Sequence, residues 1–91
     1  MASPDSDSQR KIINRLRRAN GQLTAVIAAM ESGASCRDVV TQLSAVGSAV
    51  DRAGFAIISS AMKECLADPE TAEAVDGTTQ EELEKLFLML A

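Results

Sequence analysis

Apolar residues recur at helical spacing along two long stretches of the chain. In the first stretch they alternate at intervals of four and three residues, through Ile12, Leu16, Ala19, Leu23, Val26 and Met30. The second stretch repeats these intervals through Val39, Leu43, Val46, Val50, Ala53 and Ile57. Because intervals of four and three keep side chains on one side of an α-helix, the pattern predicts two long helices.

The ends of these helices are marked by residues that favour caps and turns. Gly33 is suited to end the first helix, and Ser35 with Asp38 to begin the second, with Cys36 as its first helical residue. Asn20-Gly21 is a turn signal in other contexts, and a hairpin break there is the alternative. Because the apolar spacing keeps its phase across this dipeptide, we predict one unbroken helix.

A third, shorter helix is predicted at the C-terminal end. Asp68-Pro69 should end the second helix, since proline disfavours a helical residue before it. Asp76-Gly77 then forms a turn, and Thr79 with Glu82 forms a capping box. The apolar face of this helix consists of Leu83, Phe87 and Leu90. The pattern thus predicts an all-α fold, with one domain over residues 6–91 behind a disordered tail at 1–5.

The second helix carries a further apolar row, which predicts two neighbours. Val40, Ile58 and Cys65 flank its main seam. One neighbour is the first helix of the same chain, and the other is a helix of a partner subunit. With 91 residues, 46% of them hydrophobic but only 2% aromatic, the chain reaches a sizeable core more easily as an oligomer of helices.

The two cysteines, Cys36 and Cys65, lie near opposite ends of the second predicted helix. A separation of 29 residues on one helix corresponds to about 40 Å, whereas a disulfide needs Cα atoms within about 7 Å. A bond within one chain is therefore excluded. If two such helices pack antiparallel, Cys36 of one chain lies beside Cys65 of its partner, and a two-fold dimer carries two identical thiol pairs.

The position of Cys36 favours a reactive thiolate, because it lies at the positive end of a helix dipole and beside Arg37. The chain has no histidine. Two thiolates alone suit a soft ion such as Cu(I), but are poor ligands for nickel, cobalt or four-coordinate zinc unless Glu64 or ligands from outside the chain join them. Sulfur redox chemistry and Cu(I) binding both remain open, and the alternative is that the cysteines are simply small apolar residues.

Basic residues are concentrated near the N-terminal end, although the net charge is −4. Five of the nine fall within nine residues that contain no acid: Arg10, Lys11, Arg15, Arg17 and Arg18. On a helix Lys11, Arg15 and Arg18 share one face, which predicts a phosphate-binding strip. The alternative is a solvated charged face. Arg52, in the second helix, has acidic neighbours with which it could pair.

Several functional classes are excluded by what the chain lacks. Without histidine no nucleophile, base and orienting group can be assembled, and no glycine-rich phosphate loop occurs, so we expect neither an enzyme nor a cofactor. No apolar run approaches the roughly 18 residues of a membrane span. The polar N-terminal segment is unlike a signal peptide, so we expect a cytoplasmic protein, in which paired cysteines are more often reactive or metal-binding than structural.

Three segments together resemble the copper-sensitive operon repressor family of bacterial regulators: NRLRRANGQL at 14–23, MESGASCRDVVTQLSAVGSAVDRA at 30–53 and MKEC at 62–65. The resemblance covers about residues 10–90. It implies a three-helix subunit, an antiparallel four-helix-bundle dimer and a dimer-of-dimers tetramer that releases operator DNA when its inducer binds. It also implies sensing thiols at Cys36 and Cys65, and DNA contacts from Lys11, Arg15, Arg18 and Arg52.

One departure from the family pattern bears on the inducer. Ala61 stands where the family's copper sensors have a histidine. The nickel and cobalt sensors need more histidines, and the formaldehyde-sensing branch needs an N-terminal proline, so the chain is most similar to the persulfide-sensing branch. The expected function is a repressor that senses persulfide or polysulfide, small reactive sulfur species, through an intersubunit Cys36–Cys65 dithiol. The alternatives are a Cu(I)-sensing repressor with the same cysteines, and a purely structural helical assembly module.

Overall fold

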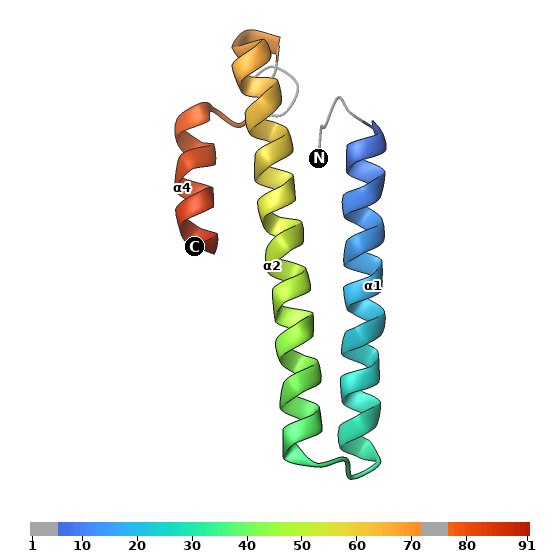
Figure 1. Ribbon diagram of the computed structural model, residues 1–91. Helices are drawn as coiled ribbons and strands as arrows, with labels where there is room; N and C mark the ends of the chain where they lie inside the picture. Colours follow the sequence, from blue (N-terminus) through green and yellow to red (C-terminus); the bar gives the residue numbers. More distant parts are fainter. Residues whose placement is uncertain (1–5, 72–76) are drawn as a thin grey trace.

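Two long helices form an antiparallel hairpin, and a shorter helix packs against the second of them on the side away from the first (Figure 1). The computed structural model describes residues 6–71 and 77–91. Its helices are α1 (Ser6–Glu31), α2 (Cys36–Ala67) and α4 (Gln80–Leu90), and the described part of the chain contains no strand. The predicted all-α fold is confirmed. The tail predicted at residues 1–5 lies outside the described residues.

Helix α1 is unbroken across Asn20-Gly21, as its apolar spacing predicted. Its buried residues are Ile12, Ala19 and Val26, which follow one another at intervals of seven and face α2. A glycine inside a helix costs about 1 kcal/mol relative to alanine. Burial of this row on both sides of Gly21 offsets that cost, and the helix continues.

The turn between the long helices follows from one glycine. Gly33 has a φ of +80°, a conformation that residues with a side chain rarely adopt. Its amide donates to the Met30 carbonyl at 3.1 Å, and the Ala34 amide donates to the Ala29 carbonyl at 2.9 Å. These two bonds form a Schellman motif, which satisfies carbonyls that the end of α1 leaves open.

Helix α2 begins where the capping pattern placed it. The Ser35 hydroxyl accepts a hydrogen bond from the Asp38 amide at 3.2 Å, and Cys36 is the first helical residue. At the other end, the Asp68 amide donates to the Glu64 carbonyl at 3.0 Å. The interruption predicted at Asp68-Pro69 is confirmed, although residues 69–71 return to helical geometry after it.

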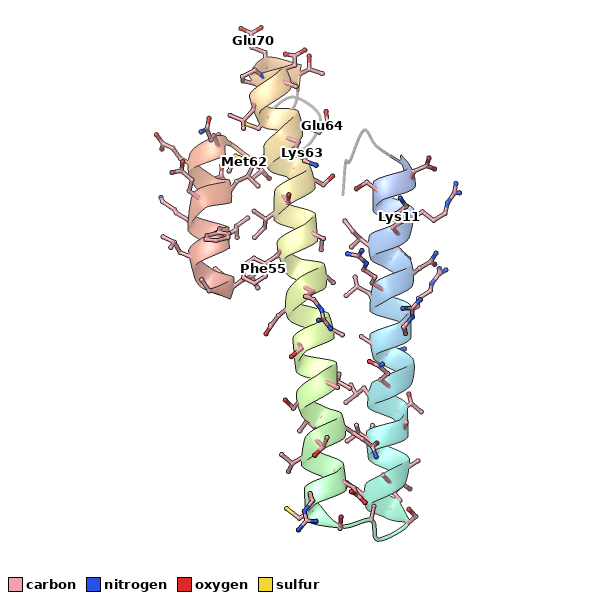
Figure 2. All side chains as sticks on the ribbon, in the orientation of Figure 1. Lys11, Phe55, Met62, Lys63, Glu64 and Glu70 are labelled. Carbon is pink, nitrogen blue, oxygen red and sulfur yellow. The ribbon has the colours of Figure 1, made fainter. Side chains whose placement is uncertain are left out.

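Helix α4 is held against the C-terminal half of α2. Thr79 and Glu82 form the predicted capping box, and Leu83 is buried. The rings of Phe55 and Phe87 meet edge to face with centroids 5.4 Å apart (Phe55 is labelled in Figure 2). Gly77 has a φ of +78°, as a turn requires. Asp76, the other residue of the predicted turn, lies outside the described residues.

The predicted apolar seams are only half buried within one chain. On α1 the alternate members Leu16, Leu23 and Met30 remain exposed, as Leu43 and Val50 do on α2. Leu23 keeps 40% of its surface and Leu43 keeps 49%. The hairpin therefore presents a second apolar surface that no element of its own described chain covers.

Candidate functional site

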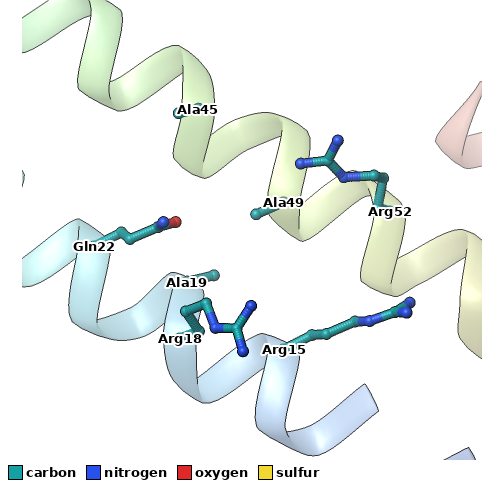
Figure 3. Close-up of a pocket in the computed structure, with 7 residues that line it drawn as sticks. All are labelled: Arg15, Arg18, Ala19, Gln22, Ala45, Ala49 and Arg52. Atoms are coloured by element: carbon teal, nitrogen blue, oxygen red, sulfur yellow. The ribbon is translucent and has the colours of Figure 1, made fainter. Parts of the chain in front are cut away.

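Three arginines from two helices line one groove. Arg15 and Arg18 reach into it from α1, and Arg52 reaches into it from α2 (Figure 3). The groove has a volume of about 440 Å³. The structure thus brings together three of the four residues expected to contact DNA, two of which lie more than thirty positions from the third in the sequence.

The charges in this groove are not neutralised by the surrounding side chains. No acidic residue among those that the structure describes lines it. In the described part of the chain, an ion pair joins Arg10 to Asp7 at 3.9 Å, and it lies outside the groove. Arg52 forms no such pair with Asp51 or any other described acid. Three guanidinium groups facing one hollow repel one another, so the groove is suited to an anion with several oxygen atoms.

The five-residue basic cluster near the N-terminal end divides between different sides of α1. Lys11 is exposed one turn before Arg15, at the same end of the hairpin as Lys63 and Glu64 (Figure 2), and does not line the groove. Arg17 is exposed but also outside the groove. Lys11 shares the face of Arg15 and Arg18 but lies one turn nearer the start of the helix. Arg17 lies on another side of α1, because successive side chains turn by about 100°.

Sequence reasoning missed the uncharged residues of the groove. Its floor consists of small side chains, Ala19 from α1 with Ala45 and Ala49 from α2. Gln22 also lines it. A signal was present for Gln22, because it continues the series Lys11, Arg15 and Arg18 at intervals of four, three and four. The alanines carried no signal, since alanine is common in any helix.

The two thiols occupy different environments at opposite ends of α2. Cys36 is exposed in the first turn, whereas Cys65 is buried, with 5% of its surface accessible. Both are free thiols on a single unbroken helix, so about 40 Å of helical rise separates them. The two thiols of one chain therefore cannot react with each other.

The described residues contain no cluster of three or more cysteine, aspartate or glutamate side chains that could hold a metal ion. One subunit supplies a single thiol at each end of α2. A pair of thiolates would match the soft, low-coordinate preference of Cu(I), but one subunit does not bring Cys36 and Cys65 together. Two thiolates alone do not fit nickel, cobalt or a four-ligand zinc site.

No helix in the described part of the chain is both long and apolar enough to cross a membrane. The long helices instead alternate apolar rows with polar faces.

Comparison with known proteins places these features in a family. Residues 8–89 match the family described as metal-sensitive transcriptional repressor. The copper-sensing transcriptional repressor CsoR of Mycobacterium ulcerans is 36% identical over 82 residues, covering 90% of this chain and 67% of the relative. CsoR of Mycobacterium tuberculosis H37Rv is 32% identical over 79 residues, covering 87% of this chain and 63% of the relative.

A relative of similar length is also found. An uncharacterized protein in the bioA 5′ region of Serratia marcescens is 33% identical over 82 residues, covering 90% of this chain and 87% of the relative. No solved structure matches significantly. The chain spans about two thirds of the length of the CsoR relatives. Since the match extends over all three described helices, the chain belongs to the metal-sensitive transcriptional repressor family, a family of repressors and not of enzymes.

Proposed function

We propose that the chain is a DNA-binding transcriptional repressor whose basic groove holds phosphates of operator DNA. The observation that carries this proposal is the convergence of Arg15, Arg18 and Arg52 on one groove, with no acidic partner among residues 6–71 and 77–91. Lys11 extends the same basic surface by one turn. A purely structural assembly module would give no reason for this arrangement, since unpaired guanidinium groups stabilise nothing within the chain.

The proposed repressor is an antiparallel dimer that pairs further into a tetramer. On α1, Arg15 and Leu16 flank the buried row of Ile12 and Ala19 on opposite sides, because each residue turns the helix by about 100°. The exposed apolar surface that includes Leu16 and Leu23 therefore lies on a different flank from the basic groove. A partner can cover the first while DNA occupies the second.

An antiparallel partner also completes the sensing site. It brings the exposed Cys36 of one subunit to the buried Cys65 of the other. The accessible Cys36 thiolate attacks the outer sulfur of a persulfide, RS–SH, so that a new S–S bond forms and RS⁻ leaves. The thiolate of Cys65 in the partner subunit then attacks the Cys36 sulfur, which forms a disulfide and releases HS⁻. A polysulfide gives the same bridge or one with additional sulfur.

The bridge controls DNA binding by linkage. If DNA binds the bridged dimer less tightly by some factor, DNA disfavours formation of the bridge by the same factor. Helix α2 connects the sensing site to the groove, because it carries Cys65 near its C-terminal end and Arg52 near its middle. A shift of α2 relative to α1 would separate Arg52 from Arg15 and Arg18.

Cu(I) is the second candidate inducer, because the named relatives are copper-sensing repressors. Cys36 and the partner's Cys65 would hold the ion, which supplies a bridge between subunits without oxidation. The persulfide proposal is preferred because Ala61, one turn before Cys65, provides no ligand and the chain has no histidine. Ala61→Cys and Ala61→His each add a possible Cu(I) ligand at this position. Ala61→His is the more informative variant, because it restores the residue type that the family's copper sensors have there.

The test of DNA binding begins with an operator selected from a random duplex library by the reduced protein. Fluorescence anisotropy then measures the affinity of Arg15→Ala, Arg18→Ala and Arg52→Ala. Each should weaken binding about tenfold or more, since charge-assisted hydrogen bonds contribute about 1.5–3 kcal/mol. Each should also lower the slope of log affinity against log salt by about one.

Arg17→Ala is the matched control, because it removes the same charge from the same helix outside the groove. It should retain most of the affinity. Equal losses for Arg17→Ala and Arg15→Ala would mean that only net charge matters. Wild-type affinity in all three groove variants would show that the groove is not the DNA site.

The inducer is identified by measuring the same affinity for reduced, polysulfide-treated and Cu(I)-loaded protein. Polysulfide should release DNA, and mass spectrometry should find an interchain link between Cys36 and Cys65. Release by stoichiometric Cu(I) with polysulfide inert would favour the copper sensor. Ala61→His should then raise the Cu(I) affinity about tenfold or more, measured by competition with a Cu(I) chelator, and leave polysulfide bridging intact.

A further inference from the structure

The uncharged residues of the basic groove have a role that its arginines do not explain. We propose that the groove seats a sugar–phosphate backbone against a floor of alanines, and that Gln22 donates a hydrogen bond to a phosphate oxygen there. This inference rests on the proposed DNA-binding function and deepens it. It concerns which neutral residues allow DNA to approach the arginines.

The shape of the groove depends on three methyl groups. Ala19 is buried between the helices, Ala49 is half-buried and Ala45 is exposed. Long side chains at exposed helix positions lie along the surface and cover it. Ala45 is exposed, so no packing within the described chain requires a small residue there, yet it and Ala49 leave the space between Arg18 and Arg52 open (Figure 3).

The arginines need this space because they come from different helices. A phosphate that bonds guanidinium groups on both α1 and α2 must lie between the helices and above the floor. A larger side chain at Ala45 would occupy that position. The effect would be steric, since neither the charge of the groove nor the fold of the hairpin depends on an exposed methyl group.

Gln22 is placed to add a contact of a different kind. Its side chain extends over the groove from α1, one turn beyond Arg18 (Figure 3). No hydrogen bond within the described residues engages its amide. An amide donor can bond a phosphate oxygen without releasing a counterion, so it adds affinity that is independent of salt.

The floor is tested with Ala45→Leu and Ala45→Ser in anisotropy measurements with the selected operator duplex. Ala45→Leu should weaken binding at least fivefold with an unchanged salt slope, whereas Ala45→Ser should stay within twofold of the wild type. Ala28→Leu, at an exposed α1 position outside the groove, is the matched control and should leave binding unchanged. Circular dichroism melting confirms that each variant is folded.

Gln22→Ala provides an independent test. It should weaken binding about fivefold, the effect of one net hydrogen bond, with the salt slope unchanged. Gln80→Ala, on α4 at the far side of α2, is the control and should bind as the wild type does.

The outcomes separate the two proposals. If Arg15→Ala and Arg52→Ala bind as the wild type, the proposed function fails. If those variants weaken binding while Ala45→Leu loses less than fivefold and Gln22→Ala less than twofold, DNA binds at the arginines without approaching the floor, and only the present inference is overturned.

Discussion

Individual side chains in this protein act mainly through local geometry. Ser35, Gly33 and Thr79 each end or begin a helix by a hydrogen bond or a backbone angle involving residues a few positions away. Asp68 does the same at the end of α2, where its carboxylate accepts hydrogen bonds from the Thr71 hydroxyl at 2.7 Å and the Thr71 amide at 3.3 Å. Such contacts make the junction after α2 sensitive to pH.

The pKa of Asp68 lies below its ordinary value of 3.8, first because of the Thr71 hydroxyl and then because of the Thr71 amide. A lowered pKa means that folding favours the carboxylate, so this contribution is complete above the ordinary pKa and is lost as pH falls through the lowered one. Thr71→Val removes the hydroxyl donor and should raise the pKa of Asp68. A carboxyl-carbon NMR titration measures it, and an unchanged pKa would contradict the assignment of cause.

At the scale of elements, the two long helices pack against each other through a narrow buried row. Each is amphipathic, and α1 buries just Ile12, Ala19 and Val26 against α2. Two glycines in or beside α1 have opposite roles. Gly21 lies within the helix with nothing within 4 Å of an added Cβ, whereas Gly33 has the positive φ of the turn.

The different backbone conformations of Gly21 and Gly33 predict opposite effects on stability when each glycine is replaced by alanine. Gly21→Ala should stabilise the protein by about 0.5–1 kcal/mol, because alanine restricts the unfolded chain and fits the helix. Gly33→Ala should destabilise it by about 1 kcal/mol, because a Cβ strains the turn. Thermal and urea unfolding followed by circular dichroism measures both. Changes of the same sign would show that backbone conformation does not govern these positions.

At the scale of the whole molecule, one chain is elongated and exposes more surface than a compact monomer of its mass. Its radius of gyration is 16.5 Å, whereas a compact chain of this length has about 12 Å. Its accessible surface is 6468 Å², compared with about 5,100 Å² for a typical monomer of its mass. The exposed surface includes the apolar rows containing Leu23 and Leu43, which fits the proposed dimer.

Leu23→Glu should therefore convert the protein from an oligomer to a monomer at micromolar concentration, since a charge would be buried in the proposed interface. Sedimentation velocity measures the change. Ala28→Glu, which introduces the same charge at an exposed position outside the apolar row, should leave the oligomer intact. A wild-type protein that sediments as a monomer would contradict the proposed dimer and the thiol pairing that depends on it.

The sequence by itself determined the helices, their caps, the unbroken passage through Asn20-Gly21 and the separation of Cys36 from Cys65, because each depends on residues within a few turns of one another. It also showed that Lys11, Arg15 and Arg18 share a face. Their role in DNA binding, like the sensing role of the thiols, remains a prediction.

Only the tertiary structure decided that Arg52 joins Arg15 and Arg18, and that alanines and Gln22 complete their groove. This arrangement depends on the register of α2 beside α1, which is set by packing between helices whose residues are far apart in the chain; Ala19 on α1 and Val46 on α2 are both buried. Tertiary packing also decided which half of each apolar seam is buried. A spacing of four and three identifies the apolar side of a helix, but burial depends on which neighbouring helix reaches it.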